Sequence, residues 1–448
     1  GNELPREGDL VHIPTGQYII LDVSPPKLSA LLIDGVLEFA RMDLRLNAHY
    51  IVVKDGRLIV GTEEEPFLEN AVITLHGTPA DTELPMYGAK VLACRRCTLD
   101  LHGKPTDVTW TRLKSTARKN TTVLHLIQNV SWDIGSTIVV ASTDLIKEHA
   151  EEVLVLNIRD GGSIVDLDRP LQYDHLGVTR NFGGHSVEMR AEVGLLSHNV
   201  IVQGDNNSAL HEFGATIMMF SPGDDSLKGR IENIEVRLAG QAGRLGRYPI
   251  HYHMIGAVRQ SYARRNSVHN TFNRAFTIHG VHYLRVQHNV AYNVKGHTYF
   301  IEDAIETKNV IEYNLGILTR RGFNLLNTDQ TPATFWITNP DNIVRHNAAG
   351  GSDNYGFWYR AESHVTGLSE GRPESTNICP KGTPLGEFRN NTAHSNGRYG
   401  LRIYDEYYPR ENPCDSNSPL VTARFKNFTT YRNNVNGVQI SAVGHLVM

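Results

Sequence analysis

One pattern recurs along the second half of the sequence: Arg265-Asn266-Ser267-Val268, His288-Asn289-Val290-Ala291, Tyr313-Asn314-Leu315-Gly316, His346-Asn347-Ala348-Ala349, Asn390-Asn391-Thr392-Ala393 and Lys426-Asn427-Phe428-Thr429. Its asparagines lie 23, 25, 33, 44 and 36 residues apart. A period of about 23 residues suits one coil of a parallel β-helix. Asparagine tolerates the left-handed backbone of a turn, and its side chain can bond the equivalent residue one coil away. The alternative is that asparagine is simply common in loops, but six matches in a shared apolar frame favour the β-helix.

Strand signals extend on both sides of this repeat. Earlier coils are expected to start at Asn199 and Asn233, and the longer gaps are expected to hold insertions at residues 329–340 and 362–384. Upstream, residues 31–39 and 50–61 have the pattern of strand–turn–strand units, the second with Asp-Gly at its turn. Short strands at close intervals predict an all-β fold.

A register set by the asparagines would stack other side chains as well. Thirteen residues after Asn266, Asn289, Asn347 and Asn391 come His279, Glu302, Arg360 and Tyr404. His251 and His253 lie just upstream and share one side of a strand, because side chains alternate along it. Such a row is unusual on the outer face of a purely structural sheet, so we expect a functional site there.

The charge pattern points to the same region. The net charge is −4, yet residues 236–301 hold nine Lys or Arg and seven of the 21 histidines, with no Asp or Glu. Arginine pairs with carboxylates, so this stretch suits an acidic polysaccharide. The alternative is a solvated or partner-facing surface, and no module typical of nucleic-acid binding is present. The candidate ligand-binding residues are Arg247, Arg264, Arg265, Arg274, Tyr359, Arg360 and Tyr404.

Glu302 and Asp303 end this acid-free stretch and are the candidate general acids, with His251, His253 and His279 beside them. Strand alternation predicts that only one of the two carboxylates faces the groove. The structural alternative is an ion pair with stacked arginines. The histidines could instead bind substrate by hydrogen bonds or hold a divalent metal with Glu302. No cofactor is required by the sequence.

The four cysteines and the sequons agree with an oxidising, extracellular setting. Cys379 and Cys414 lie in polar, proline-rich loops and are expected to form a disulfide, whereas Cys94-Arg-Arg-Cys97 could be half of a redox or zinc site. Glycosylation is expected at Asn120, Asn129, Asn206 and Asn390, and is doubtful at Asn427, which the repeat places in a coil. No stretch reaches the roughly 18 apolar residues of a membrane span. Residues 1–5 are not a signal peptide, so we expect a piece of a larger protein.

Several segments together resemble a known family. Gly8-Asp9-Leu10-Val11-His12-Ile13-Pro14 and Thr109-Trp110-Thr111-Arg112-Leu113 resemble the glycine-punctuated G8 domain. Downstream, the chain resembles the β-helix of fibrocystin-L-like cell-surface proteins and, less closely, the cell-surface hyaluronidases of the transmembrane and secreted kinds. The matching segments include Tyr248-Pro249-Ile250-His251-Tyr252-His253, Phe300-Ile301-Glu302-Asp303-Ala304-Ile305-Glu306 and Phe335-Trp336-Ile337-Thr338-Asn339-Pro340. Ala304 departs from the family pattern, which has glycine there.

This resemblance implies a G8 domain at residues 1–118, a β-rich connecting segment at 119–190 and a right-handed, pectate-lyase-like parallel β-helix at 191–448. It also implies an extracellular or secreted location, a ciliary surface included, with any membrane anchor outside this segment. Two functions follow. One is a scaffold or adhesion ectodomain that binds an acidic glycan or a cell-surface protein; the other is a hyaluronan-degrading glycosidase. A hydrolase needs two carboxyls about 5–5.5 Å apart if retaining or about 6.5–9.5 Å if inverting, and Glu192, Glu235 and Asp353 are weak candidates for the second.

Overall fold

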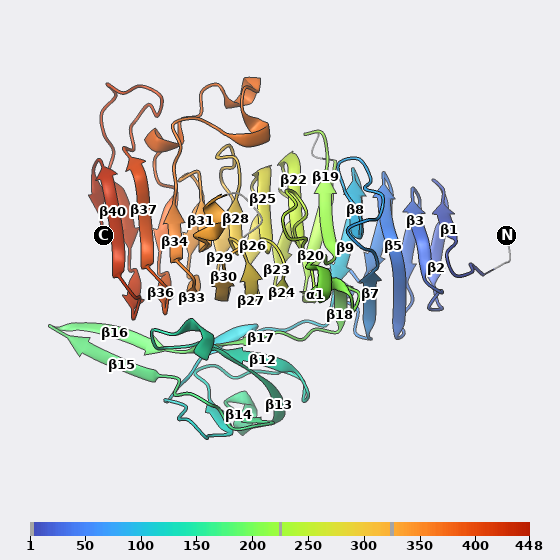
Figure 1. Ribbon diagram of the computed structural model, residues 1–448, viewed down its shortest axis with the longest axis horizontal. Helices are drawn as coiled ribbons and strands as arrows, with labels where there is room; N and C mark the ends of the chain where they lie inside the picture. The colour runs from blue at the N-terminus through green and yellow to red at the C-terminus, as the bar shows by residue number, and fades with distance from the viewer. Residues whose placement is uncertain (1–3, 224–225, 323–326) are drawn as a thin grey trace.

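The computed structural model describes residues 4–223, 226–322 and 327–448, so residues 1–3 of the predicted G8 segment lie outside it. Its main body is a parallel β-helix in which each coil contributes a strand to each of three faces (Figure 1). The all-β fold and the parallel β-helix predicted from the sequence are thus confirmed. Within the described residues, none of the helices is long and apolar enough to cross a membrane.

The first face carries the predicted site. Its strands are β1 (Leu10–Ile13), β3 (Leu28–Ile33), β5 (Leu44–Lys54), β8 (Val91–Arg95), β19 (Thr216–Phe220), β22 (Ile250–Ala257), β25 (Phe276–His282), β28 (Tyr299–Ile301), β31 (Ala333–Ile337), β34 (Tyr355–Tyr359), β37 (Tyr399–Tyr407) and β40 (Asn436–Val443).

The second face shares the long strand β5, whose first half pairs with β7 and whose second half pairs with β8. Its other strands are β7 (Ala71–Leu75), β18 (Val200–Gly204), β21 (Ile234–Arg237), β24 (Ser267–Thr271), β27 (Val290–Lys295), β30 (Leu315–Arg320), β33 (Ala348–Ser352), β36 (Thr392–His394) and β39 (Thr429–Tyr431).

The third face closes the coil. Its strands are β2 (Tyr18–Leu21), β4 (Val36–Phe39), β6 (Arg57–Val60), β9 (Thr98–His102), β20 (Lys228–Glu232), β23 (Tyr262–Arg264), β26 (Arg285–Gln287), β29 (Val310–Glu312), β32 (Ile343–Arg345), β35 (Glu387–Arg389), β38 (Ala423–Lys426) and β41 (Leu446–Val447).

The predicted strand–turn–strand units are not hairpins. β3 and β4 do not pair with each other; β3 pairs in parallel with β5, and β4 with β6. The Asp-Gly turn, with Asp55 at a φ of 57°, instead bends the chain from the first face to the third. Parallel stacking of coils therefore starts at β1, far upstream of residue 191. The predicted domain limits at residues 118 and 190 stay predictions.

Between β9 and β18 the chain leaves the helix and then rejoins it in register. β18 stacks on β7, β19 on β8 and β20 on β9, so residues on either side of the excursion form one continuous solenoid. The excursion forms an antiparallel sheet of β10 (Trp110–Arg112), β11 (Val123–His125), β12 (Thr137–Val140), β13 (Glu151–Arg159), β14 (Ile164–Leu167) and β17 (Glu192–Leu195), with a hairpin of β15 (Gly177–Phe182) and β16 (His185–Arg190). We call residues 103–199 the insert.

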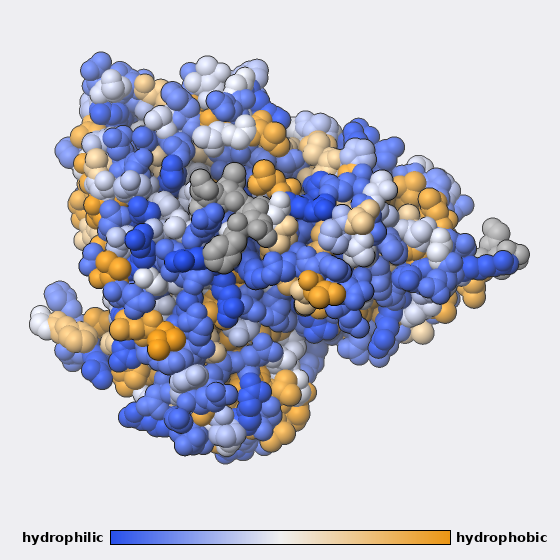
Figure 2. Space-filling model, viewed as in Figure 1, coloured by the Kyte–Doolittle hydropathy of each residue, from blue (hydrophilic) through white to orange (hydrophobic). Residues whose placement is uncertain are grey.

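The insert lies along the second face as a separate lobe (Figures 1 and 2). A small apolar cluster joins the two parts, with Val139 of the insert packed with Val290 and Leu315 of the solenoid. Elsewhere on the side shown in Figure 2, hydrophilic residues predominate and hydrophobic ones are scattered among them.

Short helical turns lie at the insert, between strands and in one long loop. They are η1 (Lys147–His149), η2 (Asp160–Gly162), α1 (Ser208–His211), η3 (Asn327–Gln330), η4 (Gly367–Ser369), η5 (Pro373–Ser375) and η6 (Pro380–Gly382). The predicted insertion at 362–384 is a loop containing the last three, drawn in orange at the top of Figure 1. The predicted insertion at 329–340 is wrong in its second half, because residues 333–337 form β31 of the first face.

The asparagine ladder is real, but one of its two proposed reasons is wrong. The side chain of each of Asn266, Asn289, Asn314 and Asn347 bonds its counterpart one coil on, ending at Asn391, with N–O distances of 2.9–3.1 Å. The left-handed backbone belongs to the preceding residue, such as His288 at a φ of 56° and Tyr313 at 54°. The side-chain ladder and the left-handed turn therefore fall on two different, neighbouring residues.

The last step of the predicted register is off by one. Thr392 pairs with Thr429, which puts Asn427 opposite Asn390 and leaves Phe428 at the ladder position. In the same way Asn233, at a φ of 52°, occupies the turn position rather than the ladder. Asn427 is accordingly exposed. The reason given against its glycosylation no longer holds.

Candidate functional site

A row of side chains crosses the outside of the first face. Each of its residues directly follows a residue whose side chain points into the core. His253 pairs with His279, and extension of the neighbouring registers adds Glu302, Thr338, Arg360 and Tyr404. The spacing of thirteen residues thus brought the right residues together and missed Thr338. A cavity of about 710 Å³ lies along this row, lined by His253, His279, Glu302, Thr338, Arg360 and residues beside them.

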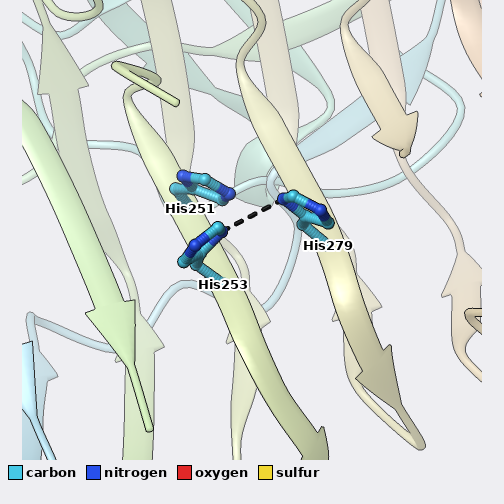
Figure 3. A group of neighbouring side chains, drawn as sticks. All are labelled: His251, His253 and His279. Carbon is cyan, nitrogen blue, oxygen red and sulfur yellow. Dashed lines mark hydrogen bonds between the residues drawn. The ribbon is translucent and has the colours of Figure 1, made fainter. Parts of the chain in front are cut away.

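Three histidines form one wall of the cavity. His251 and His253 project from β22 towards His279 on β25 (Figure 3). Nδ1 of His253 lies 3.1 Å from Nδ1 of His279, and Nδ1 of His251 lies 3.0 Å from the carbonyl of Gly246. Burial, reinforced by the neighbouring imidazoles, holds the pKa of His251 well below its usual value, and burial lowers that of His253 to about 3.

His279 is held between two carboxylates. Its Nε2 lies 2.6 Å from Asp303 Oδ2 and its Nδ1 lies 3.2 Å from Glu302 Oε2. Burial opposes a charge on this ring, but the charges of Glu302 and Asp303 outweigh it and raise the pKa of His279 to about 9. Burial also raises the pKa of Glu302.

Both carboxylates line the cavity, so the prediction that only one would do so is wrong. β28 ends at Ile301, and the chain then turns through Ala304 at a φ of 69°, so strand alternation no longer applies. This left-handed position explains why glycine suits it. The turn is fixed by Glu306, whose Oε1 accepts hydrogen bonds from the backbone of Gly280 at 2.8 Å and Asp303 at 3.0 Å.

The loop of residues 362–384 covers one side of the cavity. The backbone N–H of Ser369 donates to Asp303 Oδ2 at 3.0 Å, and that of Thr366 donates to the Asp303 carbonyl at 2.9 Å. Leu368, at 60% exposure, stands at the cavity edge. Asp303 therefore links the loop to His279.

An aromatic cluster two residues upstream of the row was missed by the sequence reasoning. Phe300 and Trp336 line the cavity, and Trp358 packs edge-on against Trp336 at 4.8 Å between ring centroids. The signal was present, since Phe300 and Trp358 precede Glu302 and Arg360 by two residues and so share their face. Trp336 Nε1 has no hydrogen-bond partner among the described residues.

Fewer arginines line the cavity than the predicted basic groove required. Arg247 and Arg360 line the cavity, and each has an acidic neighbour, Glu83 at 3.1 Å and Glu362 at 3.0 Å. Arg274 is fully buried beneath Phe300, paired with Asp329 at 2.6 Å, where no ligand reaches it.

Arg264 and Arg265 were expected in the groove but do not line it. They lie at the end of β23 on the third face and both pair with Glu232, at 2.7 and 3.0 Å. The acid-free stretch misled because its neutralising partners lie outside it: Glu232 just before its start, and Glu63 and Glu83 far upstream.

The two tyrosines differ in position. Tyr359 points into the core against Phe388 and Phe425, so its assignment as a ligand-binding residue is wrong. Side chains alternate along a strand, so Tyr359 has to point inward because the next residue, Arg360, points outward into the cavity. Tyr404 packs at the edge of the aromatic cluster, with the Arg402 guanidinium 4.1 Å from its ring centroid.

All four cysteines are paired. Cys379 and Cys414 form the predicted disulfide, and it ties the loop of residues 362–384 to the chain after β37. Cys94 and Cys97 form a second one between β8 and β9, which leaves no thiolates for the zinc interpretation, while the redox interpretation stays a prediction. Of the predicted glycosylation sites, Asn120, Asn129 and Asn206 are exposed and Asn390 is half-buried; their modification stays a prediction.

Comparison with known proteins agrees with this architecture. A model described as G8 domain matches residues 1–114, and one described as CEMIP β-helix matches residues 212–401. Human fibrocystin-L is 42% identical over 473 residues, which cover 96% of this chain but only 11% of that protein. Human cell surface hyaluronidase CEMIP2 is 32% identical over 383 residues, 71% of this chain and 27% of that protein.

Among solved structures, the tailspike protein gp49 of Pseudomonas phage LKA1 covers 96% of this chain with a TM-score of 0.26 and 11% identity, over 74% of its own length. The assignment to a family rests instead on the two matched domains and the sequence identities. The chain belongs to the family of G8-domain and CEMIP-type β-helix proteins that includes fibrocystin-L.

Proposed function

We propose that this chain is part of an extracellular cell-surface protein with a scaffold or adhesion role, and that the cavity on its first face binds an acidic glycan. The relative named as a cell surface hyaluronidase supports the location and the ligand class. The chain spans 11% of fibrocystin-L, so these relatives say nothing of what the rest of the parent protein does.

The observation that carries this proposal is the group of unpaired polar atoms in the residues that line one cavity. Trp336 Nε1, Arg247 Nε, His251 Nε2 and Glu302 Oε2 are buried in residues that line it and have no hydrogen-bond partner among the described residues. Buried polar atoms are ordinarily paired, so a cavity that collects four of them is suited to a polar ligand.

The cavity also offers the contacts that an acidic sugar needs. The rings of Phe300 and Trp336 can pack against the apolar face of a sugar, while their neighbours supply polar contacts. Arg247 and Arg360 can pair with its carboxylate or sulfate, since a guanidinium presents several donors in a plane.

The test measures binding of hyaluronan, chondroitin sulfate and heparin oligosaccharides to the immobilised protein. Replacement of Arg247 and Arg360 by glutamine should weaken binding at least about tenfold, since loss of a charged contact costs a few kcal/mol. Replacement of Arg264 and Arg265 on the third face is the matched control and should leave it unchanged. Equal effects of the two pairs, or no binding to any of the three polymers, would overturn the proposal.

A second candidate, hyaluronan hydrolysis, is favoured by one observation. Glu302 and Asp303 contact opposite nitrogens of His279, and all three line the cavity. Incubation with size-defined hyaluronan should then shorten the polymer at some pH between about 4 and 8, and Glu302→Gln or Asp303→Asn should abolish the shortening. A polymer of unchanged length with the unaltered protein would eliminate this candidate and leave glycan binding standing.

A further inference from the structure

We propose that His251, His253 and His279 form a binding site for a zinc-like transition-metal ion in the wall of the cavity. This goes beyond the proposed glycan binding and does not depend on it. His251 and His253 on β22 and His279 on the adjacent strand β25 lie next to one another (Figure 3). One nitrogen from each lies within 4.8 Å of the others, and all three side chains are buried.

The hydrogen bonds of these rings engage one nitrogen of His251 and one of His279 with backbone or carboxylate oxygen. Nδ1 of His251 can donate to the carbonyl of Gly246 at 3.0 Å, which leaves Nε2 as the lone-pair atom, and this Nε2 is buried without a partner. Nε2 of His279 donates to Asp303 at 2.6 Å. Its Nδ1 faces Glu302 and carries a proton in the metal-free protein, so a metal ion binds there by displacing that proton, as metal binding to histidine commonly does. A metal-bound histidine usually donates its second ring nitrogen to a carbonyl or carboxylate in this manner.

The spacing of the rings also suits a metal. Nδ1 of His253 and Nδ1 of His279 lie 3.1 Å apart, close to the roughly 3.4 Å between two nitrogens on one tetrahedral zinc ion with bonds of about 2.1 Å. All three nitrogens lie within 4.8 Å of one another, so the rings have to draw slightly closer together when an ion binds.

The ligand set defines the class of ion. Three imidazoles suit zinc, cobalt, nickel or copper, whereas calcium and magnesium prefer oxygen ligands. Glu302 Oε2, 3.2 Å from His279 Nδ1 and without a hydrogen-bond partner, stands where a fourth ligand would lie. Alternatively, the cavity leaves that fourth position open to a ligand.

The residues behind the histidines connect the site to a loop. Asp303 fixes the ring of His279 and is itself held by the backbone N–H of Ser369 in the loop of residues 362–384. Metal binding should therefore stiffen this loop as well as the histidines, which a purely packed histidine cluster would not do.

The first experiment titrates the metal-free chain of residues 1–448 with Co²⁺ and then Zn²⁺. One Co²⁺ per chain should bind and give the intense visible absorption of a tetrahedral or five-coordinate complex, and Zn²⁺ should abolish that absorption by displacing it. Elemental analysis after dialysis against zinc should find one ion per chain. No visible band and no retained zinc would overturn the proposal.

The variants separate metal binding from packing. His253→Gln should lose the cobalt band, while His282→Gln, three residues beyond His279 on β25 and hydrogen-bonded to Thr307, should keep it. If His253→Gln does not fold, His253→Cys provides the second test, because a thiolate also binds zinc and cobalt. It should restore binding with an added sulfur-to-cobalt band in the near ultraviolet. Identical spectra for His253→Gln and His282→Gln would contradict the site.

Discussion

Glu192 Oε2 lies 2.7 Å from Nε2 of His394, and this buried contact joins the insert to the second face of the solenoid across 202 residues of sequence. Arg112 reaches the other carboxylate oxygen, Oε1, at 3.1 Å. Both Glu192 and His394 have no exposed surface. The insert is therefore attached by a buried charge cluster as well as by the small apolar contact around Val139.

Replacement of Glu192 by glutamine should loosen this attachment. Arg112 would lose its closest countercharge, and removal of one partner from a buried pair typically costs about 3–5 kcal/mol. Hydrogen exchange should rise in β10, β17 and β36, and the free energy of unfolding should fall. Glu188→Gln is the control, since its half-exposed carboxylate lies 3.7 Å from Arg112 and should matter by less than about 1 kcal/mol. Equal losses for the two variants would show that the charge cluster does not hold the insert.

The same glutamate predicts a loss of stability in acid. Burial opposes its ionisation, but His394 and Arg112 outweigh burial and lower the pKa of Glu192 to about 2 from 4.5. Because the folded pKa is the lower one, the stabilisation is complete above about pH 4.5 and is lost as the pH falls towards 2, an effect on the order of 3 kcal/mol.

Unfolding free energies of the unaltered protein and of Glu192→Gln measured across this range check the linkage. The difference between them should shrink as the pH falls. A difference that stays constant between about pH 6 and pH 3 would assign the effect to packing instead of ionisation.

The sequence predicted the solenoid well, because the asparagine ladder depends on local chemistry that repeats with each coil. The ladder residues Asn266 to Asn391 are buried and bond one another, so each coil demands the same side chain. The first coils escaped notice because β1 to β9 lack this ladder. Their glycine turns looked like hairpins, since a turn that bends a coil and one that reverses a strand use the same residues.

The candidate site was predicted less completely. The row of His279, Glu302 and Arg360 followed from a fixed spacing. Arg264 and Arg265 were wrongly expected in the groove of the first face, because the face on which a residue lies depends on where its coil turns. The partners that neutralise the arginines come from segments up to about 200 residues away, as in Arg264 with Glu63. No periodic pattern within one coil could reveal such contacts.

A break in the ladder should be costly. The side chain of Asn314 accepts two hydrogen bonds from Asn289 and donates to Asn347 and to the carbonyl of Val286. Asn314→Leu would leave four buried groups without this partner, so unfolding should be easier by at least about 3 kcal/mol. Chemical denaturation measures this, with the exposed Asn207→Leu as the control, expected to change stability by less than about 0.5 kcal/mol. A loss below 1 kcal/mol for Asn314→Leu would mean that water replaces the ladder at little cost.

Replacement of Ala304 by glycine should stabilise the protein. Ala304 follows Glu302 and Asp303 with a φ of 69°, a conformation that costs a residue with a Cβ about 1–2 kcal/mol and glycine nearly nothing. Glycine also gains entropy in the unfolded chain, which offsets part of the gain, so we expect a net increase of about 0.5–1 kcal/mol. The midpoint of chemical denaturation measures it. Ala275→Gly, at a buried position on the approach to β25 without a left-handed φ, is the control and should be destabilising. If Ala304→Gly were destabilising to the same extent, the loss of the buried methyl group would outweigh the backbone strain at this turn.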